Sequence, residues 1–481
     1  MKSSRIHQSD SDDNYKEICT TSYPFKRKPS LYLYSLIICR KWEECNQLID
    51  EKRSLLRTAT NPQLLHLACT YHAPVNVISK LISLYPDCLL FQDANHRTPL
   101  HTAIICSSGN SAALGLPGGN YKRDIIEFLL RACPQATRLK TKQDNWIPLH
   151  TACHYTQTPL SILKLLIYVD PQTLLIENKG GVTPLQMLCQ SFLQKLRIDS
   201  SEPLSLESMN FSQISARAAS AGIDIENIDV FPSWDKIQFA IKHLYFYNRN
   251  SNYDYFARNL GNAQEENDMY SPLVHATAGT PSIPRDIVWF ILFLHGNQLQ
   301  SYNHEGLLPL HISILACGHY YSVSVANQNY FASCRSNPID LLLRVYPQAA
   351  SMPYLNQKHD GRFPLNVAIQ NKISWENGLK DLFKAAPDII KKRDVGGIFF
   401  TSSVLSTGFR GQSTGLYPFM IAATVSYEDY SVGRICNCIS TTIEEDKTNI
   451  EAIYQLLRVC PELVQFYNTD VDDESKRCVL S

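Results

Sequence analysis

A short motif, Pro-Leu-His or a close variant, recurs along the chain, and its spacing constrains the fold more than any other feature. The motif occurs eight times: its leucine stands at positions 65, 100, 149, 185, 273, 310 and 365, and Phe419 takes that place in the last unit. Where no extra sequence intervenes, successive leucines are 35, 36 or 37 residues apart. A period of this length indicates one small supersecondary unit that cannot bury its own apolar face. We therefore expect several such units to share a core by stacking.

Each unit also carries a second apolar run of helical periodicity, usually closed by a proline, as in "VISKLISLYPDC" at 77–88. The first residues of the motif are those favoured at the start of a helix. Thr98 can cap the first helix while Pro99 fills the first helical position, where no N–H is needed. Thr158 can cap a second helix in the same way. Turn-forming runs such as "NHEG" precede the next motif, so each unit is predicted to contain two helices and a hairpin.

With these motifs the chain resembles the ankyrin-repeat family over roughly residues 31–468. Its observed steps are close to the period of about 33 residues that this family shows. The Tyr-Pro or Cys-Pro pair after several second helices resembles the divergent ankyrin proteins of diatoms and related algae. The resemblance implies an all-α fold, namely an ankyrin-repeat solenoid of stacked helix pairs with hairpin fingers.

The motif positions also predict how the chain is divided, starting from a disordered polar tail and an atypical pair of capping helices. For the capping helices, an F-box-like helix is the alternative interpretation. Repeats one to four and five to seven follow, separated by a long connecting segment, and a long finger precedes a divergent last repeat. The predicted ranges are 1–30 (tail), 31–60 (capping helices), 61–247 (repeats one to four, with a disordered Ser-rich loop at about 198–232), 248–270 (connection), 271–397 (repeats five to seven), 398–416 (finger), 417–468 (last repeat) and 469–481 (tail).

Insertions lengthen every second unit between its two helices, near 107–120, 198–232, 318–336 and 426–447. These insertions could form a second surface. They could equally mark the one edge where extra length costs little, because loop-closure entropy grows slowly with length.

Charge and cysteine usage restrict the class of protein. Lys plus Arg and Asp plus Glu are both 45, so no net field attracts nucleic acid or an anionic membrane. The first 30 residues lack the apolar segment of a signal peptide, which favours an intracellular chain, cytoplasmic or nuclear, with its 15 cysteines reduced. The longest apolar run, Ile287–His295, is too short for a membrane span of about 20 residues. A buried helix is expected there instead.

Histidines and cysteines that look reactive occupy repeated slots of the motif, and "NWIPLHTACHY" at 145–155 contains three of them. A histidine follows the leucine in four units, at positions 66, 101, 150 and 311. In ankyrin-like units this imidazole bonds within and between fingers, so the resemblance implies a structural role. Cys69, Cys153 and Cys189 lie four residues after the leucine, where the second unit has Ile104. A slot that accepts isoleucine indicates a buried apolar position rather than a catalytic thiol.

No cofactor or metal site is predicted. Cys436 and Cys438 form a lone Cys-Asn-Cys, whereas structural zinc needs two pairs of ligands at suitable spacing. "GFRGQSTG" at 408–415 is glycine-rich but lacks the lysine of a phosphate-binding loop. Because the repeats occupy most of the chain, no stretch remains for an ordinary catalytic domain, and the protein is expected not to be an enzyme.

The resemblance implies a non-enzymatic interaction module or adaptor that binds a protein partner on the concave face of the stack. Helical period places the residues two, five and six positions after the leucine on one exposed face. Trp, Tyr and Arg are favoured anchors of interfaces. The predicted partner-binding residues are Tyr71, His96, Arg97, Thr102, Trp146, Thr151, His154 and Tyr155. Leu307 and Arg362 are further expected finger tips.

Three alternatives remain open at this point. The chain could be a regulatory or substrate-receptor subunit of a ubiquitin ligase, phosphatase or kinase complex, it could contain a hidden hydrolase, or its ankyrin-like surface could bind a membrane protein and so tether the chain to a membrane. The expected partner is a protein, without nucleic acid and without membrane insertion. Its identity and the oligomeric state do not follow from the sequence.

Overall fold

A computed structural model of the 481-residue chain describes residues 29–58, 61–108, 121–155, 157–196, 211–220, 222–225, 227–228, 231–249, 272–280, 283–324, 338–356, 361–392, 394, 416–425, 450–458 and 461. Within these residues the regular structure is helical throughout, with no strand, so the predicted all-α class is confirmed. The chain divides into two compact units. Unit 1 contains residues 1–196, 222–247 and 251–261, and unit 2 contains 197–221, 248–250 and 262–481.

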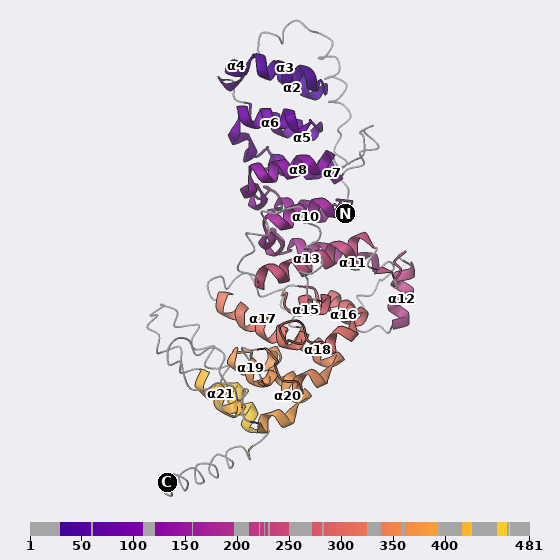
Figure 1. The fold of residues 1–481 in the computed structure, drawn as a ribbon, viewed down its shortest axis with the longest axis vertical. Helices are drawn as coiled ribbons and strands as arrows, with labels where there is room; N and C mark the ends of the chain where they lie inside the picture. The colour runs from indigo at the N-terminus through magenta and orange to yellow at the C-terminus, as the bar shows by residue number, and fades with distance from the viewer. Residues whose placement is uncertain are drawn as a thin grey trace. The chain divides into compact units, whose positions relative to one another are not determined.

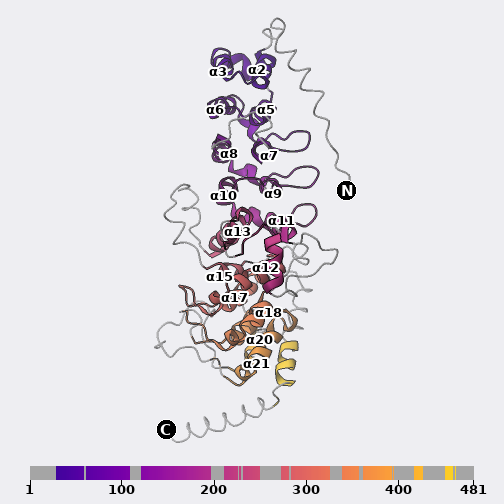
Figure 2. The ribbon, with the colours of Figure 1, turned by 90° about the vertical axis from the view of Figure 1, so that its right-hand side faces the viewer.

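Unit 1 begins with three short helices and continues with four helix pairs. The short helices are α2 (Pro29–Ile38), α3 (Trp42–Glu51) and α4 (Arg53–Thr58). The pairs are α5 (Leu64–Thr70) with α6 (Val75–Leu84), α7 (Pro99–Ser108) with α8 (Tyr121–Ala132), α9 (Pro148–His154) with α10 (Leu160–Val169), and α11 (Pro184–Leu196) with α13 (Pro232–Arg249). The first helices of the pairs form one layer and the second helices another (Figures 1 and 2). Neighbours within a layer pack on each other, as α5 does on α7 and α7 on α9.

Prolines end the second helices, as the sequence predicts. The 3-10 helices η2 (Pro86–Leu89), η4 (Pro134–Arg138) and η5 (Pro171–Leu175) follow α6, α8 and α10. A proline disfavours the α conformation of the residue before it. Tyr85, Cys133 and Asp170 accordingly have ψ between 74 and 88° and leave the helix. The turn that follows leads the chain to the next hairpin.

The core of unit 1 lies between the two layers and contains the motif leucines. Leu65, Leu100, Leu149 and Leu185 are each at most 2 % exposed. Cys69, Cys153 and Cys189 are buried as well, which confirms the small apolar slot four residues after each leucine. Deleting such a side chain typically costs about 2–5 kcal/mol, so these residues hold the layers together.

Unit 2 repeats the pairing of helices. Its helices are α12 (Phe211–Ser220), α15 (Leu273–Ala278), α16 (Arg285–Leu294), α17 (Pro309–Ser324), α18 (Ile339–Val345), α19 (Pro364–Gln370), α20 (Leu379–Ala385), α21 (Pro418–Val425) and a helix at 450–458. The 3-10 helices are η8 (Gly296–Gln300), η9 (Pro347–Ser351), η10 (Trp375–Asn377) and η11 (Pro387–Lys391). The motif helices α15, α17, α19 and α21 pack in chain order, each on the next.

The apolar run at 287–295 forms most of α16, where Ile287, Phe290 and Ile291 are fully buried, so the buried helix predicted there is confirmed. Among the described residues, no helix combines the length and the apolar character needed to cross a bilayer.

Four sequence expectations need correction. The insertion at 198–232 is not unstructured throughout, because α12 forms within it and buries Ile214 and Ala218. The insertion expected from 318 begins inside α17, which continues to Ser324. Thr158 does not cap α10, since the capping position belongs to Pro159 and the Thr158 hydroxyl has no partner. The thiols are not all reduced: eight described cysteines are free, but Cys39 is disulfide-bonded.

Several predicted segments lie outside the described residues. They are residues 1–28 of the N-terminal tail, the whole C-terminal tail (469–481), residues 250–270 of the connecting segment and residues 398–415 of the long finger. Cys436 and Cys438 lie outside them as well.

Candidate functional site

Three hairpin turns of unit 1 support the candidate site, at 93–97, 141–146 and 178–182. A backbone hydrogen bond closes each turn: 2.9 Å from Asp93 N to Arg97 O, 2.9 Å from Thr141 N to Trp146 O, and 3.0 Å from Asn178 N to Val182 O. The first side chain of each turn accepts further N–H groups. The Asn178 Oδ1, for example, accepts the N–H groups of Gly180 and Val182 at 2.8 and 3.0 Å. The conformation is therefore fixed by residues within the turn itself.

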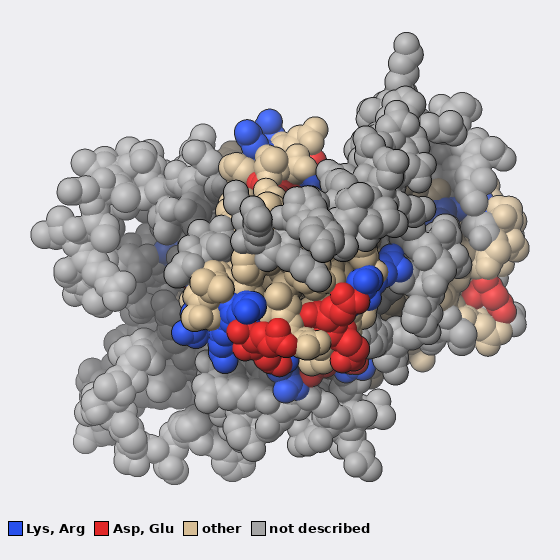
Figure 3. Space-filling view, turned by 90° about the horizontal axis from the view of Figure 1, so that it is seen from above, with Lys and Arg blue, Asp and Glu red and all other residues tan. Residues whose placement is uncertain are grey.

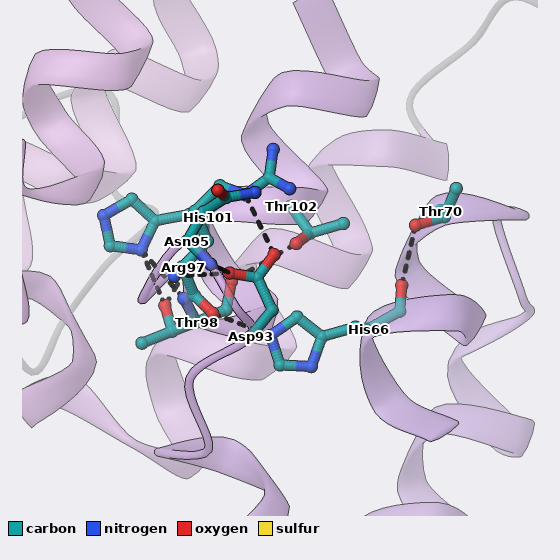
Figure 4. Close-up of polar contacts among 8 residues, drawn as sticks. All are labelled: His66, Thr70, Asp93, Asn95, Arg97, Thr98, His101 and Thr102. Atoms are coloured by element: carbon teal, nitrogen blue, oxygen red, sulfur yellow. Dashed lines mark hydrogen bonds and ion pairs between the residues drawn. The ribbon is translucent and has the colours of Figure 1, made fainter. Parts of the chain in front are cut away.

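The carboxylate of Asp93 accepts several hydrogen bonds within its own turn (Figure 4). Its Oδ1 accepts the N–H groups of Asn95 and Arg97 at 2.8 and 2.9 Å, and its Oδ2 accepts the Arg97 Nε at 2.9 Å. Burial alone would raise the pKa of Asp93, but these N–H donors and the guanidinium charge lower it below its ordinary value. Asp93 therefore stays ionised, and Arg97 is held against its own turn.

Neighbouring hairpins are joined into a row. The Lys142 N–H donates to Asn95 O at 3.0 Å, and the Lys179 N–H donates to Asp144 O at 2.9 Å. His96 and Asn145, near the tips, have positive φ angles of 56 and 53°. Such backbone is uncommon for residues other than glycine and is tolerated best by short polar side chains. The tips thus have a defined geometry before any partner binds.

The motif histidines link each unit to the next hairpin, which confirms their predicted structural role. The Nε2–H groups of His66, His101 and His150 donate to the carbonyls of Arg97, Trp146 and Val182 at 2.8, 3.1 and 3.0 Å. Figure 4 shows the His66 and His101 rings beside the turn at 93–97.

The second ring nitrogen fixes the tautomer. The Nδ1 of His101 accepts the Thr98 N–H at 3.2 Å, and the Nδ1 of His150 accepts the Ile147 N–H at 3.3 Å. A ring that accepts at Nδ1 and donates at Nε2 is neutral. Burial lowers the pKa of both His101 and His150 to about 4. Neither imidazole can therefore act as a ligand or base without breaking the link between units.

The motif cysteines are equally unsuited to chemistry. Burial raises the pKa of Cys69, Cys153 and Cys189 far above the ordinary thiol value, so all three remain protonated. The part of the chain that the structure describes also contains no group of three or more His, Cys, Asp or Glu placed to hold a metal ion.

Trp146, His154 and Tyr155 form an aromatic cluster beside the second hairpin. The ring centroids of Trp146 and His154 are 4.7 Å apart, and those of His154 and Tyr155 are 5.3 Å apart with an edge-on interplanar angle of 79°. His154 is exposed, while Trp146 and Tyr155 are half-buried. Trp146 comes from the hairpin and the other two from the end of α9, so the fold brings together three of the predicted site residues.

The other predicted residues lie apart from this cluster. His96 is exposed at the first hairpin tip, and the side chain of Arg97 is paired with Asp93. Tyr71 lies at the end of α5, with the guanidinium carbon of Arg40 at 5.9 Å from its ring centroid. Thr102 is half-buried and donates its hydroxyl to Thr98 O at 3.4 Å.

Three residues expected at the surface are buried. Thr151 is 3 % exposed, because α9 turns that position toward the neighbouring helices. Leu307 and Arg362 are each 1 % exposed. The expectation that these three residues belong to a recognition surface is therefore wrong.

Arg362 instead forms a buried ion pair that the sequence did not reveal. Its Nε donates to Asp394 Oδ1 at 2.9 Å, and its Nη2 lies 2.9 Å from Asp394 Oδ2. Asp394 is fully buried, and Asn366 also donates to its Oδ1 at 3.3 Å. This cluster links the segment before α19 to the turn that follows η11.

Further residues that share the histidine slot were also missed. Counted from the start of each helix, the third residue is His275 in α15, Gln186 in α11 and Asn366 in α19. His275 donates to Ser301 O at 3.0 Å, and Gln186 Oε1 accepts the Thr183 N–H at 3.0 Å. When the units are aligned on the motif leucine, His275 does not fall on the other histidines, because it is two residues after Leu273 rather than one.

Near the N-terminal helices of unit 1, the surface charges are of mixed sign. Basic and acidic side chains lie next to one another on the face shown in Figure 3. Ion pairs near the N-terminus of unit 1 join Lys41 with Glu44 at 3.0 Å and Lys80 with Asp50 at 2.6 Å. Charges of mixed sign do not create the field that attracts a polyanion.

Comparison with known proteins gives no relative: no family model matches the chain, and no curated protein matches it.

Proposed function

We propose that the chain is an ankyrin-repeat solenoid that binds a protein partner through the concave face of unit 1, without catalysing a reaction. The recurring helix pairs, the row of hairpins and the imidazole links between them support this reading of the fold. A preformed stack of this kind orders little of itself on binding and so avoids part of the entropic cost of association.

The observation that carries the proposal is the aromatic cluster of the exposed His154 with the half-buried Trp146 and Tyr155. Its rings pack against one another at 4.7 and 5.3 Å, so little side-chain freedom would be lost on binding. Aromatic side chains of this type are over-represented among the residues that dominate binding energy. The reactive-looking groups beside it, His150 and Cys153, are buried and neutral and leave the surface without a catalytic residue.

The test is binding of a partner that is first identified by affinity purification of the full chain and then purified. The double variant Trp146→Ala/Tyr155→Ala should raise the Kd at least about 30-fold, as expected for two hot-spot residues. Only side chains are removed, so the Trp146 carbonyl still accepts the bonds of Thr141 and His101. The melting temperature should therefore not change.

The matched control is Tyr454→Ala, which removes a tyrosine that is 61 % exposed in unit 2. This variant should bind as the wild type does. An unchanged Kd for the double variant, with the protein folded, would contradict the proposed surface.

A further inference from the structure

The first described helix of unit 1, α2, is apolar on its outer as well as its inner face. Its ten residues include no charged side chain, whereas α3 beside it has two acidic residues in its first turn. Leu33, Leu36 and Ile37 are buried where α2 packs on α3, α4 and α5. Helical period places Leu31 and Ile38 on the opposite face, and Leu31 is 43 % exposed. A helix that is apolar all round is normally buried, and the end of a repeat stack is normally polar, so a cover for α2 is expected.

A disulfide at the end of α2 indicates what this cover is. Cys39 follows the helix directly, and its N–H donates to Ser35 O at 2.9 Å. Cys39 is disulfide-bonded, while the other described cysteines are free, so its partner lies outside the described residues. Of the cysteines there, Cys19 belongs to unit 1 together with Cys39. The others belong to unit 2, namely Cys334, Cys436, Cys438, Cys460 and Cys478.

The length of chain between Cys19 and α2 determines where a bond from Cys39 to Cys19 would place residues 20–28. The ten residues of α2 make it about 15 Å long, with Pro29 at its start and Cys39 just beyond its end. Nine residues can span up to about 30 Å. With this bond formed, residues 20–28 must return along the length of α2, and they are long enough to do so. Their sequence, TTSYPFKRK, includes Tyr23 and Phe25, which are side chains suited to an apolar helix face.

The setting of Cys39 makes such a bond reversible. A disulfide breaks when a thiolate attacks one of its sulfurs, so exposed disulfides are the labile and regulatory ones. Cys39 is half-buried and can be reached in this way. Cys45 in α3 is fully buried, and burial raises its pKa to about 12, so it stays a thiol and does not compete for the bond.

We propose that a disulfide between Cys19 and Cys39 holds residues 20–28 over the outer face of α2, and that reduction of this bond uncovers the face. A dithiol reductant supplies the two electrons. Its own two thiols become a disulfide as the bond between Cys19 and Cys39 breaks, and each cysteine takes up one of the two protons released. The inference does not depend on the proposed function, because α5 and α7 separate α2 from α9 and its aromatic cluster.

Peptide mapping tests the bond itself. The full chain is equilibrated with oxidised glutathione, its free thiols are blocked with N-ethylmaleimide, and it is digested with trypsin. Mass spectrometry should find peptide 17–26, which contains Cys19, linked to peptide 28–40, which contains Cys39. Dithiothreitol should separate them. A link from peptide 28–40 to any other cysteine, a disulfide-linked dimer, or N-ethylmaleimide on both Cys19 and Cys39 would overturn the inference.

Hydrogen exchange tests the cover. Dithiothreitol should speed exchange of the α2 amides at least about 10-fold, because the end helix loses the segment tied to it, and should leave α9 unchanged. Cys19→Ser and Cys39→Ser should each show the fast exchange without a reductant. Cys106→Ser changes a half-buried free cysteine of α7 and should behave as the wild type does. Equal exchange of α2 in the oxidised and reduced chains would overturn the inference even where the bond is found.

Discussion

The two units share the imidazole links between motif helices and the following turns, but unit 2 replaces one of these links with a different chemistry. In unit 1, neutral imidazoles at His66, His101 and His150 reach across to the next turn. In unit 2, His275 and His311 make the same link to Ser301 O and Met352 O at 3.0 Å. The corresponding position of α19 is Asn366, and there the buried pair of Arg362 and Asp394 makes the link. A buried neutral imidazole is satisfied by two hydrogen bonds, one to a carbonyl and one from an N–H group. A buried ion pair is stable only while each charge has its partner of opposite charge. The difference predicts that the stability contributed by the imidazole links depends on pH, whereas the link at α19 is sensitive to the loss of a single charged partner.

The largest effect is expected in unit 2. Asp394→Ala leaves the Arg362 guanidinium buried without its counter-charge, which typically costs about 3–5 kcal/mol. Hydrogen exchange measured by mass spectrometry should show faster exchange in α19 and α20 and unchanged exchange in unit 1.

Two further variants sharpen this prediction. Arg362→Met/Asp394→Leu removes both charges and should recover most of the lost stability. Asp93→Asn neutralises the acidic partner of the half-exposed pair of unit 1 but keeps an oxygen to accept the Asn95 and Arg97 N–H groups. It should cost less than Asp394→Ala, because exposed pairs contribute about 1 kcal/mol or less. An equal loss in the free energy of unfolding for the two aspartate variants would contradict this difference between the exposed and the buried pair.

The second effect is the pH dependence of unit 1. The pKa of His101 and of His150 falls from an ordinary 6.5 to about 4 on folding, so between these values the unfolded chain binds more protons. Stability is therefore fully present above pH 6.5 and is lost as the pH falls toward 4, by on the order of 3 kcal/mol for each ring.

His101→Gln provides the control, since Gln186 already fills the same slot and accepts the Thr183 N–H. The free energy of unfolding, measured in urea at several pH values, should fall less between pH 6.5 and 4 for this variant than for the wild type. If the free energy of unfolding falls equally with pH in both proteins, His101 is not held neutral in the folded state.

A smaller effect is expected at His275. The residue three positions before it is Pro272, which has no N–H, and the His275 Nδ1 consequently has no partner. The equivalent residue before His101 is Thr98, which donates to Nδ1. Pro272→Thr should supply that donor and stabilise α15 by about 1 kcal/mol. Exchange of the α15 amides should slow; faster exchange would show that the fixed φ of proline contributes more than the missing bond.

Local chemistry explains what could be predicted from the sequence. Helix starts, proline-closed second helices and the roles of His101 and His150 depend on residues within one motif or its immediate neighbour. The Arg362–Asp394 pair joins residues 32 positions apart, and nothing near either residue indicates burial. Thr151 was misplaced because a helical period defines a face but not how closely the next helix covers it. α12 was missed because the whole insertion was assigned from its Ser-rich composition, although Ile214 and Ala218 lie one helical turn apart and are buried.

The central claim, that unit 1 binds a protein through its concave face, is tested most directly by hydroxyl-radical footprinting of the full chain with and without its purified partner. We predict that oxidation of Trp146, Tyr155 and Met187 falls in the complex, while that of the exposed Tyr454 in unit 2 does not change. Unchanged oxidation of Trp146 and Tyr155 with strong protection of Tyr454 would contradict the account.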